Sequence, residues 1–194
     1  MAALTQTTDL MPTFLDYFGV PAPPHVHGRS LRPTWEAGEA VHDSLIFGYF
    51  GMALNATDGR YTYFRNPVVP DATVYAYTAM PVSLRSFMER GDLARAETGR
   101  FLGHTYNIPV YKVPQEKGLQ GGKIPLGPPH RHDGYLDAAG HYDPHHELFD
   151  LIADPRQETP LRDPALEARF RDLLRAHLAR VAAPPEQFAR LGLD

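Results

Sequence analysis

The chain has 194 residues, and 43% of them are apolar, which is enough to bury the core of one domain of ordinary size. Its 19 basic and 23 acidic residues leave a net charge of −4, which argues against a nucleic-acid partner and against binding to an anionic membrane surface. The absence of cysteine excludes disulfides and thiolate zinc sites, and since neither a membrane span nor a signal peptide is visible, we expect a cytoplasmic protein.

The first predicted element is a short helix from Asp9 to Phe18. Asp9 is placed to cap the helix, Pro12 falls in its first turn, and Gly19 stands where a left-handed residue commonly ends a helix. Its apolar residues are spaced to form one face: Leu10, Phe14, Leu15 and Phe18. Such a face needs a surface to pack on. The prolines that follow predict an extended chain over residues 20–32.

Aromatic and branched residues between positions 41 and 65 predict β-strands. Within this stretch, the pair Asp58-Gly59 predicts an antiparallel hairpin whose turn has positive φ at both of these residues. A third extended run, over 73–78, is expected to join the same sheet. A short helix from Val82 to Arg90 and a further strand near 107–113 are predicted for the middle of the chain.

The last part of the chain contains a long irregular stretch and a helix. Residues 118–146 are rich in Gly, Pro, His and Asp without periodicity, which indicates a loop. Asp163 is placed to cap the final helix, Pro164 takes its first position, and Pro184-Pro185 ends it. The apolar stripe of this helix repeats at helical spacing: Leu166, Phe170, Leu173, Leu174, Leu178 and Val181. Strands followed by this helix predict an α+β fold, with an antiparallel sheet of about three or four strands packed against the C-terminal helix.

Four blocks of the sequence, in order, resemble bacterial members of the sulfatase family, a branch of the alkaline-phosphatase superfamily. The blocks are Thr8 to Leu15 with Gly19 to Pro21 and His27 to Leu31, then Asn55 to Tyr61, then Glu147 to Leu161, and then Ala183 to Leu193. The resemblance implies that residues 1–38 are a remnant of the family's large α/β domain. It also implies that residues 39–194 form the C-terminal subdomain, with the irregular His-rich loop at 118–146.

The same resemblance implies a hydrolase of sulfuric esters whose catalytic residues lie upstream of this chain. The family converts the first residue of a Cys/Ser-x-Pro-x-Arg motif into formylglycine and uses a divalent metal ion held by Asp, Asn or His side chains. No position matches that motif, since Ser30 to Pro33 has these residue types in another order, and His132 to Gly134 does not match the metal pair. We therefore expect no catalytic residue and no cofactor within this chain, and no turnover by the chain alone.

A C-terminal subdomain of this kind can still form a wall of the substrate site. His104 and Lys112, in the middle segment, are the candidate wall contacts. The implied partner is a separately encoded catalytic half. Self-association is the alternative, because the apolar face of the Asp9 to Phe18 helix lies exposed if the large domain is absent.

A histidine cluster supports a different hypothesis, a metal-binding protein. Five histidines fall within seventeen positions, interleaved with carboxylates, and imidazole with carboxylate suits zinc or a similar ion. The candidate metal ligands among them are His130, His132, His145 and His146. No complete zinc motif is present, so solvated loop histidines and contacts to a partner remain alternatives. Asn55 begins a glycosylation pattern, but in the absence of a signal peptide we expect it to be a turn residue.

Overall fold

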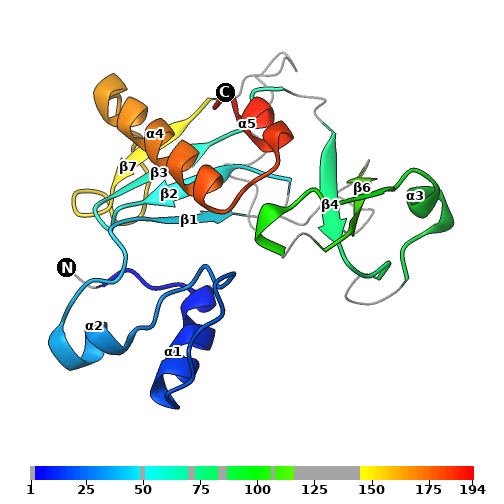
Figure 1. Cartoon of the computed structure of the whole chain (residues 1–194). Coiled ribbons are helices and arrows are strands. Elements are labelled where there is room, and N and C mark those ends of the chain that lie inside the picture. Colours follow the sequence, from blue (N-terminus) through cyan, green and yellow to red (C-terminus); the bar gives the residue numbers. More distant parts are fainter. Residues whose placement is uncertain (1–2, 49–50, 70–72, 83–86, 106–107, 116–144) are drawn as a thin grey trace. The chain divides into compact units, whose positions relative to one another are not determined.

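The structure is a computed structural model that describes residues 3–48, 51–69, 73–82, 87–105, 108–115 and 145–194 (Figure 1). Helices and antiparallel strands are combined in an α+β fold, as expected. The chain divides into two compact units. The first comprises residues 1–48, 53–65 and 146–181, and the second comprises residues 49–52, 66–145 and 182–194. The division near residue 38 that the sulfatase resemblance implies stays a prediction.

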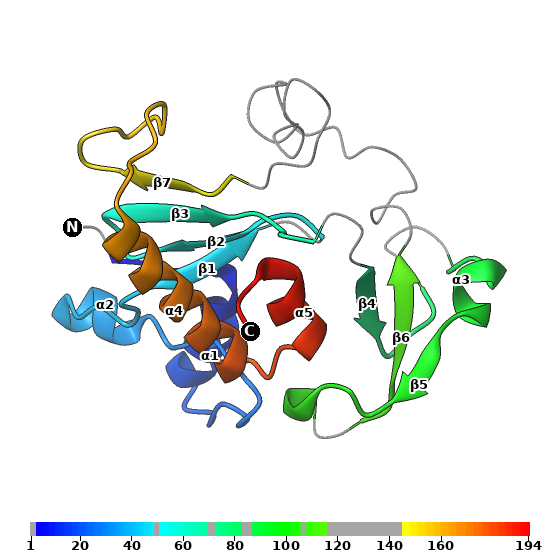
Figure 2. The ribbon, with the colours of Figure 1, turned by 90° about the horizontal axis from the view of Figure 1, so that it is seen from above.

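The first unit contains a four-stranded antiparallel sheet in the order β1-β2-β3-β7. The strands are β1 (Leu45–Gly48), β2 (Leu54–Thr57), β3 (Tyr61–Arg65) and β7 (Glu147–Asp150). Helix α4 (Pro164–Arg180) packs against this sheet, and Figure 2 shows it lying across the strands. The expected sheet of about three or four strands with a C-terminal helix is therefore confirmed.

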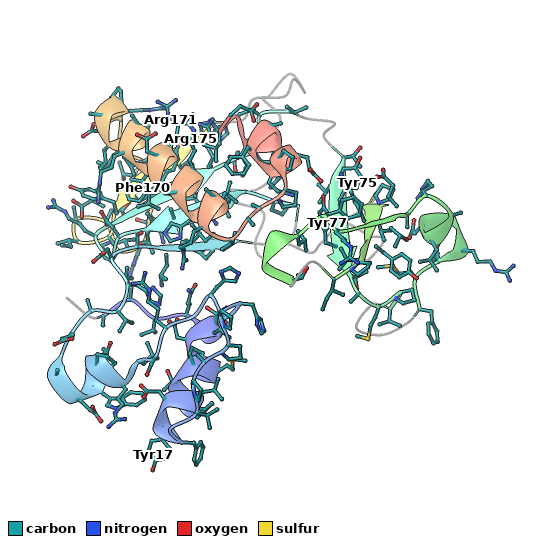
Figure 3. All side chains as sticks on the ribbon, in the orientation of Figure 1. Tyr17, Tyr75, Tyr77, Phe170, Arg171 and Arg175 are labelled. Atoms are coloured by element: carbon teal, nitrogen blue, oxygen red, sulfur yellow. The ribbon has the colours of Figure 1, made fainter. Side chains whose placement is uncertain are left out.

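The core of the first unit lies between the sheet and α4. Ala56, Tyr63 and Leu148 occupy directly paired positions of three neighbouring strands, so their side chains share one face of the sheet, and all three are buried. Phe170 of α4 contacts this face, with its ring centroid 5.9 Å from that of Tyr63 (Figure 3). Phe170 and Leu174 are both fully buried, and burying a side chain of this size contributes roughly 1.5–3 kcal/mol.

The predicted hairpin is confirmed, but its turn differs from the prediction. Strands β2 and β3 pair antiparallel, with Thr57 opposite Thr62. Positive φ occurs at Gly59 (+87°) and not at Asp58. Instead of adopting positive φ, Asp58 uses its side chain, which accepts hydrogen bonds from the amides of Arg60 and Tyr61 at 3.0 and 2.8 Å. Side-chain bonds of this kind let aspartate close a turn with ordinary φ.

Helix α4 begins as the sequence predicts. Asp163 caps it, because its Oδ1 accepts a hydrogen bond from the Leu166 amide at 2.9 Å, and Pro164 takes the first helical position. After a break at Pro184, however, a further helix, α5 (Pro185–Leu191), belongs to the second unit. Pro185 starts this helix, which sequence reasoning missed because a Pro-Pro pair was taken only as a stop signal.

The second unit contains a three-stranded antiparallel sheet in the order β4-β6-β5. Its strands are β4 (Val74–Thr78), β5 (Glu97–Gly99) and β6 (Val110–Gln115), and the short helices α3 (Arg90–Ala94) and η2 (Gly103–Thr105) complete it. The expectation that the run 73–78 joins the hairpin sheet is wrong, since β4 pairs with β6. The strand expected near 107–113 is confirmed as β6.

The helix expected over Val82 to Arg90 is not formed as predicted. Residues 83–86 lie outside the described part of the chain. Val82 and Phe87, which flank them, form an antiparallel bridge, and helix α3 begins only at Arg90. The loop predicted for 118–146 lies outside the described residues except for His145 and His146.

The N-terminal part of the first unit holds three short helices. These are η1 (Thr7–Asp9), α1 (Leu10–Tyr17) and α2 (Arg32–Ala37), of which α2 was not expected. The predicted helix is confirmed as α1, and Gly19 ends it with φ of +67°. The apolar face of α1 is exposed to solvent rather than packed in the core.

Candidate functional site

The most deeply buried charged group among the described residues is Asp9, at the start of α1. Its carboxylate is 0% exposed and accepts hydrogen bonds from the backbone amides of Gln6 and Arg29, each at 2.9 Å. The prediction that Asp9 caps the helix is wrong, because its side chain makes no bond to the first turn of α1. The carboxylate instead joins two segments that are 20 residues apart.

His42 completes the environment of Asp9. Its Nε2 lies 2.9 Å from both carboxylate oxygens, and its side chain is 3% exposed. Because both oxygens are acceptors, Nε2 carries the hydrogen. Burial alone would raise the pKa of Asp9, but the amides of Arg29 and Gln6 and the His42 ring outweigh it and hold the pKa below its ordinary value of 3.8. Sequence reasoning missed His42, which lies 33 residues from Asp9 and within no motif.

A second set of contacts fixes the same two segments. Thr13 Oγ1 donates to the Asp9 carbonyl at 2.6 Å and accepts from the Leu31 amide at 2.9 Å. Gly28 packs so closely that a Cβ atom built there would lie 1.9 Å from the Thr8 carbonyl oxygen. We call Asp9, Thr13, Gly28, Arg29 and His42 the Asp9 knot. Since the Asp9 carboxylate accepts from two backbone amides and from His42, and both bonds of Thr13 Oγ1 join the same segments, the knot has the character of a structural cross-link.

Ser44 and His177 form a pair that resembles a nucleophile with its base. Ser44 Oγ lies 3.0 Å from His177 Nε2, within the range found in serine nucleophiles. The other ring nitrogen, Nδ1, lies 3.4 Å from the Arg180 guanidinium, which can only donate. Burial, and then the charge of Arg180, lowers the pKa of His177 below 6.5, so the ring is neutral at pH 7.

The tautomer of His177 decides what this pair can do. In a neutral ring whose Nδ1 accepts from Arg180, the single hydrogen is on Nε2, which then donates to Ser44 Oγ. A nitrogen that donates to the hydroxyl cannot remove its proton. A serine nucleophile needs the opposite tautomer, held by a carboxylate acceptor at Nδ1. The pair therefore has the distance but not the polarity of a catalytic dyad.

The predicted wall residue Lys112 lies at the centre of an aromatic cluster in the second unit. Its Nζ lies 4.2 Å from the ring centroid of Tyr75 and 5.9 Å from that of Tyr77. The Phe101 ring is 5.8 Å from the same nitrogen, and the Glu186 carboxylate on α5 is 3.0 Å from it. Figure 3 shows Tyr75 and Tyr77 together on β4. Alternate residues of a strand share a face, which is why the two rings flank one ammonium group.

Glu186 is the shared acceptor of this Lys112 cluster. Tyr77 Oη donates a short hydrogen bond to its carboxylate, and Lys112 pairs with the same oxygen. Burial, and then the neighbouring carboxylate, raises the pKa of Tyr77 above its ordinary value of 10, so the phenol is a hydrogen-bond donor at neutral pH. The cluster combines a cation, a phenol donor and flat apolar rings, and both the cation and the phenol are engaged by the Glu186 carboxylate.

The other candidate residues are placed less informatively. His104 belongs to η2, but its side chain lies outside the described part of the structure. Its role as a wall contact beside Lys112 therefore stays a prediction. His130 and His132 also lie outside the described residues. The backbone carbonyl of His145 accepts from Asn66 Nδ2 at 2.6 Å, and the His146 ring lies 6.2 Å from the Tyr63 ring.

A metal site therefore stays a prediction. Within the described ranges, no three His, Asp or Glu side chains lie close enough together to hold a metal ion.

The prediction that Asn55 is a turn residue is wrong. Asn55 lies inside β2 and is 8% exposed.

Two comparisons of the sequence with known proteins give no match. No family model matches the chain, and no curated protein matches its sequence. Among the described segments, no helix has both the length and the apolar character to cross a membrane. The relationship to sulfatases that the four sequence blocks suggest stays a prediction.

Proposed function

We propose that this chain is the C-terminal portion of a sulfatase-like hydrolase, which forms a wall of the substrate site and obtains the nucleophile and metal ion from another polypeptide. The observation that carries the proposal is that the segments of the first block contact each other and that the second and third blocks contact each other, whereas the fourth block, Ala183 to Leu193, belongs to the second unit. The block Thr8 to Leu15 and the block His27 to Leu31 are joined by the Asp9 knot.

The second and third blocks contact each other in the same way. The hairpin block, Asn55 to Tyr61, lies beside the block Glu147 to Leu161, because β3 pairs with β7. The Leu151 amide donates to the Arg60 carbonyl at 2.7 Å, and the Arg60 guanidinium pairs with Asp150 at 3.0 Å. If the sequence similarity were due to chance, there would be no reason for these blocks to contact each other. The observed contacts therefore support the proposal.

The proposed wall contact is the Lys112 cluster. Hydrolysis of a sulfate ester requires stabilisation of the negative charge on the ester oxygens. Lys112 supplies one positive charge, and Tyr75 and Phe101 supply aromatic surface against which an aryl group can stack. The Glu186 carboxylate competes with the ester for Lys112, so this residue serves to bind and orient the substrate rather than to catalyse.

The proposal is tested by assaying the purified chain and its combination with a polypeptide that carries the Cys/Ser-x-Pro-x-Arg motif. The substrates are 4-nitrophenyl sulfate and a phosphonate monoester, each with manganese or calcium and with a chelator. We expect no turnover by the chain alone and metal-dependent turnover by the combination. Turnover by the purified chain that a substitution within this chain abolishes would contradict the proposal.

The wall role is tested in the active combination. Lys112→Met should raise KM for the aryl sulfate while leaving kcat within a small factor, since a wall contact binds ground state and transition state alike. Arg95→Met is the matched control, because Arg95 belongs to an exposed pair with Asp92 in the same unit. An unchanged KM in the Lys112 variant would remove Lys112 from the substrate site.

A further inference from the structure

Helix α1 exposes most of its apolar residues and holds a polar residue, Thr13, on its buried side, the reverse of an ordinary surface helix. Its buried residues are Pro12 and Thr13, and Thr13 is held inward by the hydrogen bonds of the Asp9 knot. The exposed residues, with their exposed fractions, are Leu10 (49%), Met11 (48%), Phe14 (60%), Tyr17 (73%) and Phe18 (74%). At helical spacing these five side chains fall within about 120° of the helix circumference. We call this surface the α1 face.

We propose that the α1 face is the contact surface between two copies of this chain, paired about a two-fold axis with the α1 helices antiparallel. This inference assigns the α1 face to a second copy of the chain rather than to the catalytic half of the proposed function, and the experiments below distinguish the two. Three properties of the face carry it: its area, its lack of charge and its symmetry about the middle of the helix.

The area is that of a small protein interface. A buried aromatic side chain removes about 150–250 Å² from water, so the three rings of the α1 face, exposed by 60–74%, present roughly 300–500 Å². Leu10 and Met11 extend the surface further. Standard interfaces bury about 800 Å² on each partner, and smaller ones belong to weak complexes. A pair of α1 faces therefore buries less than a standard interface, and we expect a weak dimer.

The charge pattern permits a copy of the same surface as the partner. A two-fold interface places each residue near its own counterpart, so a charged face would oppose like charges. None of the five residues of the α1 face is charged. The neighbouring charges are already paired with one another, because Arg32 lies 3.6 Å from Asp16 and 2.7 Å from Glu36. Antiparallel helices also align their dipoles favourably.

The position of Phe14 makes the geometry testable. The residue lies near the middle of the eight-residue helix α1, so in an antiparallel pair the two Phe14 side chains meet at the symmetry axis. Tyr17, nearer the end of α1, then lies beside Met11 of the other copy. Figure 3 shows Tyr17 directed away from the ribbon of α1 into solvent.

The first experiment measures mass by light scattering and sedimentation from micromolar to hundreds of micromolar protein. We expect the mass to rise from one chain of 21.7 kDa toward two. Phe14→Cys should then form a disulfide-linked dimer on mild oxidation, and the chain has no other cysteine to compete. Phe87→Cys is the matched control, since Phe87 is 80% exposed but lies in the second unit, and it should remain largely unlinked.

The second experiment uses charge at the symmetry axis. Phe14→Glu and Phe14→Lys should each be monomeric, and an equal mixture of the two should recover the dimer, whereas Phe87→Glu should dimerise like the unsubstituted chain. A chain that stays monomeric throughout the concentration range overturns the proposal. If, in addition, the Phe14 substitutions weaken binding to a catalytic polypeptide, the α1 face belongs to that partner instead. A dimer that both Phe14 charge variants retain overturns it as well.

Discussion

Replacement of Asp9 by asparagine should destabilise the first unit by about 3–5 kcal/mol, because a buried charged acceptor loses the equivalent of about two of its hydrogen bonds. The carboxylate accepts from the amides of Gln6 and Arg29 and from His42, each at 2.9 Å. Each hydrogen bond to a charged group contributes about 1.5–3 kcal/mol. Asparagine keeps one carbonyl oxygen but turns an NH₂ group toward the remaining donors, so part of this sum is lost and a repulsive contact is added.

The assay is unfolding in urea, followed by the fluorescence of Trp35. Trp35 is the one tryptophan of the chain and lies on α2, in the same unit as Asp9, so its signal reports on this region. Asp16→Asn is the matched control, since Asp16 also belongs to α1 but its side chain is 40% exposed, and the loss there should be far smaller. A loss below about 1 kcal/mol for Asp9→Asn would refute the view that the knot holds this region together.

Acidification provides an independent check on the same group. The pKa of Asp9 in the folded chain lies below its ordinary value of 3.8. The Asp9 carboxylate therefore binds a proton more readily in the unfolded chain than in the folded one. The stabilisation that the ionised carboxylate provides is present above pH 3.8 and is lost as the pH falls through the folded pKa. The Asp9→Asn variant should lose stability less steeply on acidification than the unsubstituted chain, as measured by urea unfolding at a series of pH values.

Further substitutions have distinct expected outcomes. Gly28→Ala should cost more than about 3 kcal/mol because its Cβ would meet the Thr8 backbone, whereas Gly91→Ala, in helix α3 with no atom within 4 Å, should be neutral to slightly stabilising when unfolding is followed by circular dichroism. His177→Gln should flatten the decline of stability below pH 6.5, because the folded pKa of His177 is lowered and the unfolded chain gains the proton first; an unchanged pH profile would count against this. Lys112→Met should destabilise the second unit by about 1–2 kcal/mol, read from chemical unfolding by circular dichroism, since an ion pair and its cation–π contacts are lost.

The Ser44 and His177 pair illustrates why a distance does not identify a catalytic site. The two residues are 133 positions apart in the sequence, and their Oγ and Nε2 atoms lie 3.0 Å apart, so no local motif predicts the contact. Their chemistry is decided by a third group, the Arg180 guanidinium, which sets the position of the ring hydrogen. A carboxylate in place of Arg180 would reverse the tautomer and make Nε2 an acceptor.

The sequence by itself determined the features that depend on neighbours a few residues away. The cap at Asp163, the left-handed residue Gly19 after α1 and the turn near Gly59 all follow from local backbone geometry and nearby hydrogen bonds. Helical spacing of apolar residues likewise predicted the buried stripe of α4 that includes Phe170. These interactions form within one or two turns of chain, so their signals are present in a short stretch of residues.

Only the tertiary structure decided which distant groups meet. The sequence identified Asp9 and the strand at 74–78, but it could not reveal that Asp9 faces His42 or that β4 pairs with β6 rather than with the hairpin. It predicted the apolar residues of α1, yet whether that face is covered depends on the path of the chain after Gly19. The physical reason is that a buried charge or a strand edge is satisfied by whichever segment folding brings to it, and the choice is made by packing over the whole unit rather than by local preference.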